Sequence, residues 1–242
     1  MNYFLIRRLA PFFVVSVLVE FVTLALLLSV ERSYVDWAIM PMTKTVGILL
    51  KTTTISFIFI MVPYVLYLWL MPAKKINTQI DKNITKAIFG IFVFYNLFEE
   101  TMSLVFWNKF SAAFNMTAIE YLLDMREVAS DITQNYLFAA YIVGLLLITR
   151  LVVRTFDKYL FVQVPSPHWF KRTVYAMIYL SFCGLIYVNI NENELEINEN
   201  YYNNELSKDG TYSLGRALWK SNINYKELLP LKIKNNNIFS EK

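Results

Sequence analysis

The sequence has very little of the chemistry that most enzymes use. Its 242 residues include one cysteine, Cys183, and one histidine, His168. A single cysteine excludes an intrachain disulfide and a metal site built on cysteines. The sequence has no glycine-rich phosphate loop, no Cys–His or Ser–His pairing and no His/Asp cluster at metal-ligand spacing. It therefore predicts no catalytic residue, no metal ligand and no cofactor-binding residue in this chain.

Charged residues are also scarce. They make up 17% of the chain, against about a quarter in soluble domains, while 56% of the residues are hydrophobic. The apolar residues fall in long runs, which is typical of a membrane protein. The basic residues lie between these runs and form no continuous stripe. This pattern argues against a nucleic-acid partner and leaves membrane lipids as the predicted partners.

Five apolar stretches are long enough to cross a bilayer as helices, which takes about 20 residues each. They cover approximately 9–30, 46–71, 87–107, 136–153 and 173–190. None alternates as a barrel strand does, so the sequence predicts an all-α fold, a polytopic membrane bundle of five transmembrane helices. Residues 1–190 form this transmembrane domain. Residues 191–242, rich in Asn, Glu and Lys, are expected to form a flexible extracytoplasmic linker.

The basic residues also predict the orientation of the bundle. One set of segments carries eleven Lys and Arg residues, and the alternate short loops carry four. Because Lys and Arg concentrate in cytoplasmic loops, we expect the N-terminus inside and the tail outside. The first set is Arg7, Arg8, Lys74, Lys75, Lys82, Lys86, Arg150, Arg154, Lys158, Lys171 and Arg172, and the second is Arg32, Lys44, Lys109 and Arg126.

The outer segment 108–135 has the pattern of an amphipathic helix. Apolar side chains at near-helical spacing oppose a charged face. Such a helix lies along the membrane interface or packs on the mouth of the bundle, and the sequence does not separate the two. The apolar positions are Phe110, Phe114, Ile119, Leu122 and Leu123, and the charged ones are Glu120, Asp124, Arg126, Glu127 and Asp131.

Four charged side chains fall inside the predicted spans: Glu20, Lys51, Glu99 and Glu100. A charge in hydrocarbon is costly, so each is a candidate for contact with a lipid headgroup. Each also has a structural explanation, since Glu20 can bond a polar neighbour inside the bundle and Lys51 can extend to the membrane surface. Glu99 and Glu100 point about 100° apart on a helix, so they are not expected to face one site. Glu120 is a further candidate in the outer segment.

His168 and Cys183 have ordinary structural explanations. His168 lies between Pro167 and Trp169 in the last cytoplasmic loop, a setting typical of a membrane-interface residue. Cys183 lies in an apolar run and is expected to be a small core residue.

Two segments carry motifs that go beyond hydropathy. The first extends from Phe98-Glu-Glu through Phe110-Ser-Ala-Ala-Phe-Asn-Met and Ile119-Glu-Tyr-Leu-Leu to Tyr136. The second reads Asn204-Glu-Leu-Ser-Lys-Asp-Gly-Thr-Tyr-Ser-Leu-Gly, followed by Asn222-Ile-Asn-Tyr. They resemble the outer loop and the linker of lipoteichoic acid synthase-like proteins, which are membrane-bound sulfatase-type enzymes of the alkaline phosphatase superfamily. The five-span layout with an external tail agrees with that family, and the resemblance implies a bacterial cytoplasmic membrane.

The resemblance implies a transferase that moves a phosphoglycerol or phosphoethanolamine headgroup from a phospholipid to an outer glycopolymer or glycolipid. In that family the nucleophile and a divalent metal belong to an extracytoplasmic domain, which would begin just after Tyr225. We therefore expect the catalytic domain to be encoded downstream or on another chain. The sequence departs from the family at Ala113, where the loop usually has Arg, at Glu120, which replaces Asp, and at Lys51, where the family has Asp.

Three functions remain open from the sequence. The first is the membrane anchor of a sulfatase-type headgroup transferase. The second is a stand-alone membrane protein that binds lipid or a partner without enzymatic activity. A small transporter is disfavoured, because an odd number of spans and few glycines do not fit paired half-bundles with broken helices.

Overall fold

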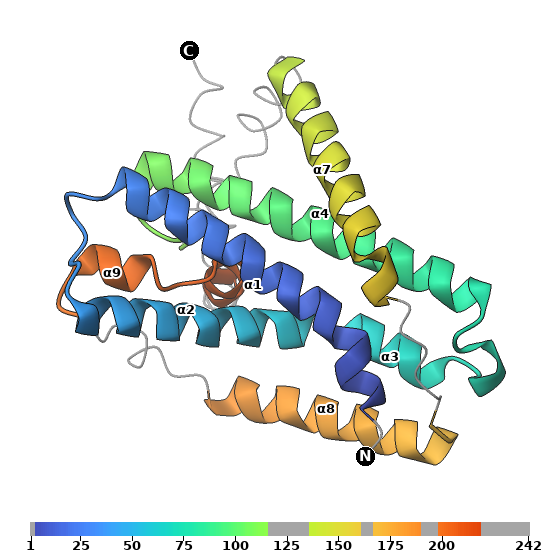
Figure 1. Ribbon diagram of the computed structural model, residues 1–242. Helices are drawn as coiled ribbons and strands as arrows, with labels where there is room; N and C mark the ends of the chain where they lie inside the picture. Colours follow the sequence, from blue (N-terminus) through green and yellow to red (C-terminus); the bar gives the residue numbers. More distant parts are fainter. Residues whose placement is uncertain (1–2, 116–135, 161–166, 190–197, 219–242) are drawn as a thin grey trace, which may run out of the picture.

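A computed structural model describes residues 3–115, 136–160, 167–189 and 198–218, and these residues form helices and turns without a strand. Figure 1 shows long helices that lie side by side, with a short C-terminal segment folded back on them. The described helices are α1 (Phe4–Val30), α2 (Ile39–Ile60), α3 (Val62–Leu70), α4 (Gln79–Phe110), α7 (Tyr136–Leu160), α8 (Trp169–Asn189) and α9 (Tyr201–Glu205), and residues 210–218 are also helical.

The predicted span 46–71 is interrupted near its centre. Helix α2 ends at Ile60, and α3 begins at Val62 with Pro63 in its first turn. Proline cannot donate the hydrogen bond that would continue the α2 ladder, whereas the first turn of a helix tolerates it. The backbone N–H of Val65 still donates to the Met61 carbonyl at 3.0 Å. The chain therefore continues in nearly the same direction as two consecutive helices (Figure 1).

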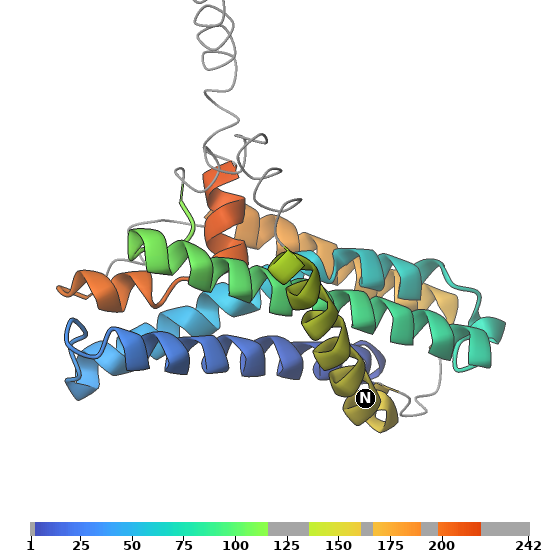
Figure 2. The ribbon, with the colours of Figure 1, turned by 90° about the horizontal axis from the view of Figure 1, so that it is seen from above.

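Helix α8 runs antiparallel to α2 and α3 along their length. At its start, Arg172 donates to the Met71 carbonyl at 2.5 Å, and further along, the Tyr179 hydroxyl donates to the Ile58 carbonyl at 2.7 Å. After α8, the Asn198 amide reaches Thr45 at 3.3 Å, near the start of α2. Successively later residues in α8 and after it thus contact successively earlier residues of α3 and α2. Figures 1 and 2 both show α8 beside these two helices.

Four of the five predicted spans are helices long and apolar enough to cross a bilayer: Phe4–Val30, Ile39–Ile60, Gln79–Phe110 and Ala139–Leu160. Helix α8, the predicted fifth span, is not among the helices that meet this criterion in the described part of the chain. The prediction of membrane helices is thus confirmed for four, and the fifth span remains a prediction.

The main core lies where α1, α3 and α4 meet. Phe12 is completely buried, and its ring lies 4.9 Å from that of Tyr64 and 5.0 Å from that of Phe89. Cys183 of α8 is buried in the same core, which confirms that it is a small core residue. His168 is exposed at the start of α8, where its ring accepts a hydrogen bond from the Phe170 N–H.

We distinguish two ends of the bundle, the basic end and the tail end. The basic end contains the start of α1, the α3–α4 connection and the start of α8. The tail end contains the end of α1, the start of α2 and the end of α4, against which residues 198–218 pack. Figure 1 shows helix 210–218 end-on between α4 and α2, and Figure 2 shows it standing roughly perpendicular to these helices. We call residues 198–218 the docked tail.

The docked tail overturns the expectation of a flexible linker for this part of the chain. Asn203 and Ser207 are completely buried, and Leu206 and Asp209 are nearly so. A segment this polar cannot form a core alone, but it becomes ordered here because polar groups of α2 bond it. Residues 190–197 and 219–242 lie outside the described residues.

The outer segment 108–135 is described only in its first part. Helix α4 continues to Phe110 and ends where Ser111 adopts a left-handed conformation with φ of 49°. Phe114 then turns back, with its ring 5.4 Å from that of Phe106. Residues 116–135, including Glu120, lie outside the described residues.

Candidate functional site

The docking surface for the tail is a row of hydroxyl side chains on α2. Thr45, Thr52 and Ser56 are separated by seven and four residues, so they lie on one face of the helix. The Thr45 and Thr52 side chains are completely buried. The charged residues in the apolar runs do not indicate this face. The spacing of hydroxyl side chains within an apolar run is a signal that could have identified it.

Asn203 of the tail fills the first position on this surface. Its side-chain oxygen accepts from the Asp36 N–H at 2.8 Å, and its amide nitrogen donates to the Asp36 carbonyl at 3.1 Å and to the Thr45 hydroxyl at 3.2 Å. Asn200 caps the short helix α9 by accepting from the Asn203 N–H at 3.0 Å. Both the oxygen and the nitrogen of this buried amide are thus hydrogen-bonded, and these bonds fix the register of the tail on α2.

Asp209 occupies the next position along the tail. Its carboxylate accepts from the Ser56 hydroxyl and from the Tyr212 N–H, the latter at 2.6 Å. The second bond is an N-cap of the helical residues 210–218. The Asp209 N–H donates to the Thr52 hydroxyl at 3.2 Å, and that hydroxyl lies 3.3 Å from the Ser207 carbonyl. One aspartate therefore both docks the tail and starts its last described helix.

Carboxyl groups from α1 and α4 converge on Asp209. Glu20 of α1 lies close to Asp209 and to Glu100, and Glu100 lies close to Thr23. All three carboxyl groups are more than nine-tenths buried. Carboxylates repel one another at close range, so a proton or a cation would stabilise such a cluster. Glu20 lies inside the bundle, in contact with polar neighbours.

Glu99 faces the tail as well. Its side chain lies close to Thr211, and its Oε1 atom is buried without a hydrogen-bond partner among the described residues. The Oε1 atom lies directly against Gly210, so that a Cβ at this glycine would overlap it. Glu99 and Glu100 thus have different neighbours: Glu99 lies against Gly210 of the tail, whereas Glu100 lines the pocket described below together with Glu20.

A small polar pocket remains beside these carboxyl groups. Its volume of about 20 Å³ is room for one water molecule. Its charged lining consists of Glu20, Glu100, Glu205 and Lys208, and Lys208 forms an ion pair with Glu205. Three carboxyl groups thus face one amine, and the pocket is suited to a proton, a water molecule or a cationic group.

The remaining candidates do not join this pocket. Lys51 is exposed on α2 and does not line it, and Glu120 lies outside the described residues. Within the described residues, no group of three or more His, Cys, Asp or Glu is placed to hold a metal ion. Of the five candidate residues, the structure thus brings Glu20 and Glu100 together at the pocket and places Glu99 against Gly210 of the tail. It adds Asp209, which the sequence alone did not indicate.

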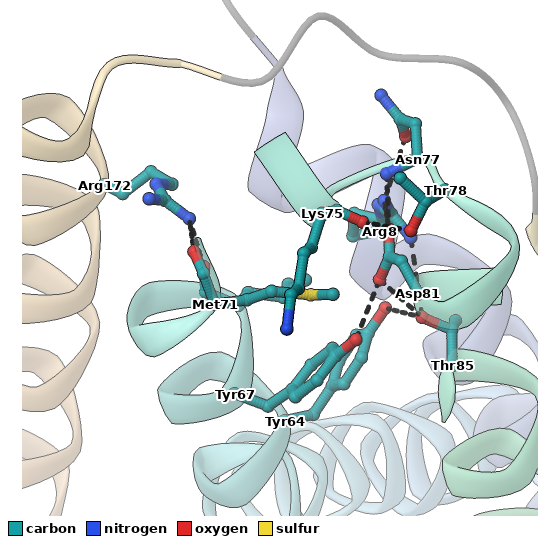
Figure 3. Close-up of polar contacts among 11 residues, drawn as sticks. Arg8, Tyr64, Tyr67, Met71, Lys75, Asn77, Thr78, Asp81, Thr85 and Arg172 are labelled. Atoms are coloured by element: carbon teal, nitrogen blue, oxygen red, sulfur yellow. Dashed lines mark hydrogen bonds and ion pairs between the residues drawn. The ribbon is translucent and has the colours of Figure 1, made fainter. Parts of the chain in front are cut away.

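The basic end buries its polar groups differently (Figure 3). Arg8 of α1 forms an ion pair with Asp81 of α4 at 2.5 Å, and both side chains are almost fully buried. The Tyr67 hydroxyl donates to Asp81 at 3.0 Å, and Arg8 also donates to the Asn77 side chain at 3.0 Å. Asn77 has a positive φ of 63°, and its N–H donates to Asp81 at 2.8 Å. This network joins α1, α3 and α4 through opposite charges.

Arg172 adds a second polar contact at the basic end. Its guanidinium donates to the Leu68 and Met71 carbonyls at 3.2 and 2.5 Å, as Figure 3 shows for Met71. Helix ends leave carbonyl groups without helical partners, and a cation is favourable there. Arg172 therefore caps α3 and attaches α8 to it.

Comparison with known proteins identifies no relative. No protein-family model, no curated protein and no solved structure matches the chain.

Proposed function

We propose that this chain is the membrane domain of a sulfatase-type headgroup transferase, and that it holds an extracytoplasmic catalytic domain against the tail end of the bundle. In this proposal α8 is the fifth span, the basic end is cytoplasmic and the docked tail is outside. The catalytic domain, with its nucleophile and divalent metal, is supplied by sequence beyond this chain or by a separate protein. The bundle supplies the anchor and the surface next to the lipid headgroups.

The observation that carries the proposal is a contact between the two segments that resemble the family. Glu99 and Ala113 belong to the first segment, and Glu205 and Gly210 belong to the second. The Ala113 N–H donates to Glu205 at 3.0 Å, and Gly210 lies against Glu99. Segments about a hundred residues apart in sequence thus pack together around one polar pocket. A linker that leaves a membrane anchor needs such a fixed exit if the attached domain is to keep its position over the bilayer.

The departures from the family pattern fall in the same place. Ala113 is buried where the family's loop has Arg, so its side chain cannot pair with Glu205. Lys208 contacts Glu205 instead. In this proposal Lys208 supplies the positive charge that the loop lacks, and the pocket keeps an acidic excess that favours a cationic group.

The alternative is a stand-alone membrane protein that binds lipid or a partner. The buried Glu99 oxygen, which has no hydrogen-bond partner in the described part of the chain, favours it, because such a group gains from an incoming donor. A fusion experiment separates the two. A sulfatase-type catalytic domain of known specificity is joined after Lys242, and transfer of labelled phosphoglycerol is measured in proteoliposomes.

The anchor proposal expects faster transfer by this fusion than by the same domain on an unrelated single-span anchor. Asn203→Ala, which releases the tail, should remove that advantage, and Glu199→Ala, at an exposed neighbouring position, should keep it. Equal rates on both anchors would contradict the proposal. The 242-residue chain alone should release no diacylglycerol from labelled phosphatidylglycerol or phosphatidylethanolamine with Mn²⁺, Mg²⁺ or Zn²⁺.

The orientation has its own test. Reporter fusions after Lys75 and Arg154 should report the cytoplasm, and fusions after Ala118 and Asn200 should report the outer side. The Asn200 fusion is decisive, because four spans would place it in the cytoplasm and five place it outside.

A further inference from the structure

A groove at the basic end, far from the docked tail, opens between α1 and α7. Its volume is about 580 Å³, and it is lined by Arg7, Ala10, Pro11, Val14, Phe156 and Tyr159. The four α1 residues recur at intervals of three and four, so they form one face of the helix. We propose that this groove binds one anionic phospholipid of the adjacent leaflet, with its phosphate on Arg7 and an acyl chain along the apolar wall.

The groove has a rigid floor. The Phe156 ring lies 5.8 Å from that of Phe89, which is completely buried in the core. Pro11 is also buried, whereas Val14 is 45% exposed and forms the open part of the wall. An acyl chain laid against Val14 would therefore rest on side chains that the core already holds in place.

Adjacent arginines have different roles at this end. Arg8 is buried in the ion pair with Asp81. Arg7 points to a different side of α1, is exposed, and forms no side-chain hydrogen bond or ion pair with the described residues. A guanidinium beside an apolar groove at a membrane surface matches the phosphate of a lipid, because it offers several donors in a fixed plane.

The surrounding charge has the same sign. Arg150, Arg154 and Lys158 recur every four residues on α7. The Lys158 ammonium lies 4.9 Å from the centre of the Tyr159 ring, which lines the groove. The acids described at this end already have partners, since Asp81 pairs with Arg8 and Asp157 pairs with Lys86 at 2.7 Å. The opening of the groove therefore attracts anions. It should hold a zwitterionic lipid less tightly than an anionic one.

The test is lipid binding to the delipidated full-length chain in detergent, measured by native mass spectrometry. The probes are dioleoyl phosphatidic acid, which carries no transferable headgroup, and dioleoyl phosphatidylcholine. The chain should bind phosphatidic acid more tightly. Arg7→Gln should weaken that binding about five-fold, the effect of one basic residue near a bilayer surface, and Arg7→Lys should preserve most of it. Val14→Trp should fill the groove and reduce phosphatidic acid occupancy.

One control position lies in α1 and the other just after its end. Arg32→Gln and Val22→Trp change an exposed arginine and a 60% exposed valine away from the groove, and both should bind as the unchanged chain does. Equal binding of the two lipids, or equal losses in Arg7→Gln and Arg32→Gln, would overturn the proposal. So would displacement of the lipid by excess inorganic phosphate, which would assign Arg7 to free phosphate. Because neither lipid is a substrate, the result is independent of the proposed transferase role.

Discussion

The two ends of the bundle bury polar groups of different kinds. At the basic end, Arg8 and Asp81 neutralise each other, and Arg172 bonds carbonyl groups at a helix end. At the tail end, hydroxyl and amide groups bond the docked tail, while Glu20 and Glu100 meet Asp209 without a paired cation among them. The first arrangement is balanced in charge and serves to hold helices together. The second leaves an acidic excess, which a purely structural joint does not need.

The largest expected effect is at the basic end. Asp81→Ala leaves Arg8 buried without its counter-charge and should lower the free energy of unfolding by about 3–5 kcal/mol. Unfolding in mixed micelles measures it. The paired substitution Arg8→Met with Asp81→Leu should restore most of the loss, because no buried charge is then left alone. An effect of Asp81→Ala no larger than that of the pair would show that charge balance is not what holds this end.

The tail end should respond locally. Asn203→Ala leaves Asp36 and Thr45 without the amide that bonds them and should weaken docking by about 2–3 kcal/mol. Thiol labelling of Ser207→Cys, at a completely buried position, measures release of the tail in a Cys183→Ala background. Glu199→Ala, at an exposed position, should leave the labelling slow. Fast labelling before Asn203 is changed would contradict a docked tail.

Two glycines in the tail offer a matched pair. Gly210→Ala places a Cβ against Glu99 and should destabilise docking by about 1–2 kcal/mol through overpacking. Gly215→Ala meets open space and should be neutral or slightly stabilising, since alanine favours a helix. The same labelling assay distinguishes them. Identical behaviour of the two variants would argue that Glu99 is not packed against the tail.

The smallest effect is expected from a single hydroxyl. Thr52→Val removes the group that accepts from the Asp209 N–H and should cost about 1 kcal/mol of docking. Thr54→Val is the control, because the Thr54 hydroxyl donates to the Leu50 carbonyl of its own helix. If both variants label alike, the tail does not depend on the hydroxyl face of α2.

The helices were predictable to different degrees. Apolar runs located α1, α4 and α7, although the helices extend beyond the runs: α4 begins at Gln79 rather than near residue 87, because polar ends can continue a helix outside hydrocarbon. Pro63 lies inside the predicted span 46–71, but it belongs to the first turn of a separate helix, α3. Hydropathy measures length and polarity and does not report such a break.

The candidate site was predictable only in part. Glu20, Glu99 and Glu100 stand out because carboxylates are rare in apolar runs. Asp209 and Asn203 do not stand out in a segment rich in polar residues. Their importance appears only when the tail lies on the hydroxyl face of α2, because that contact buries them.

The sequence by itself determined that the chain forms apolar helices and that its basic residues collect at one end, because these properties depend on composition and spacing along the chain. Only the tertiary structure decided which polar groups meet. The pairing of Arg8 with Asp81 and the convergence of Glu20, Glu100 and Asp209 join residues between about seventy and two hundred positions apart. Such contacts depend on how whole helices pack, which no local pattern in the sequence specifies.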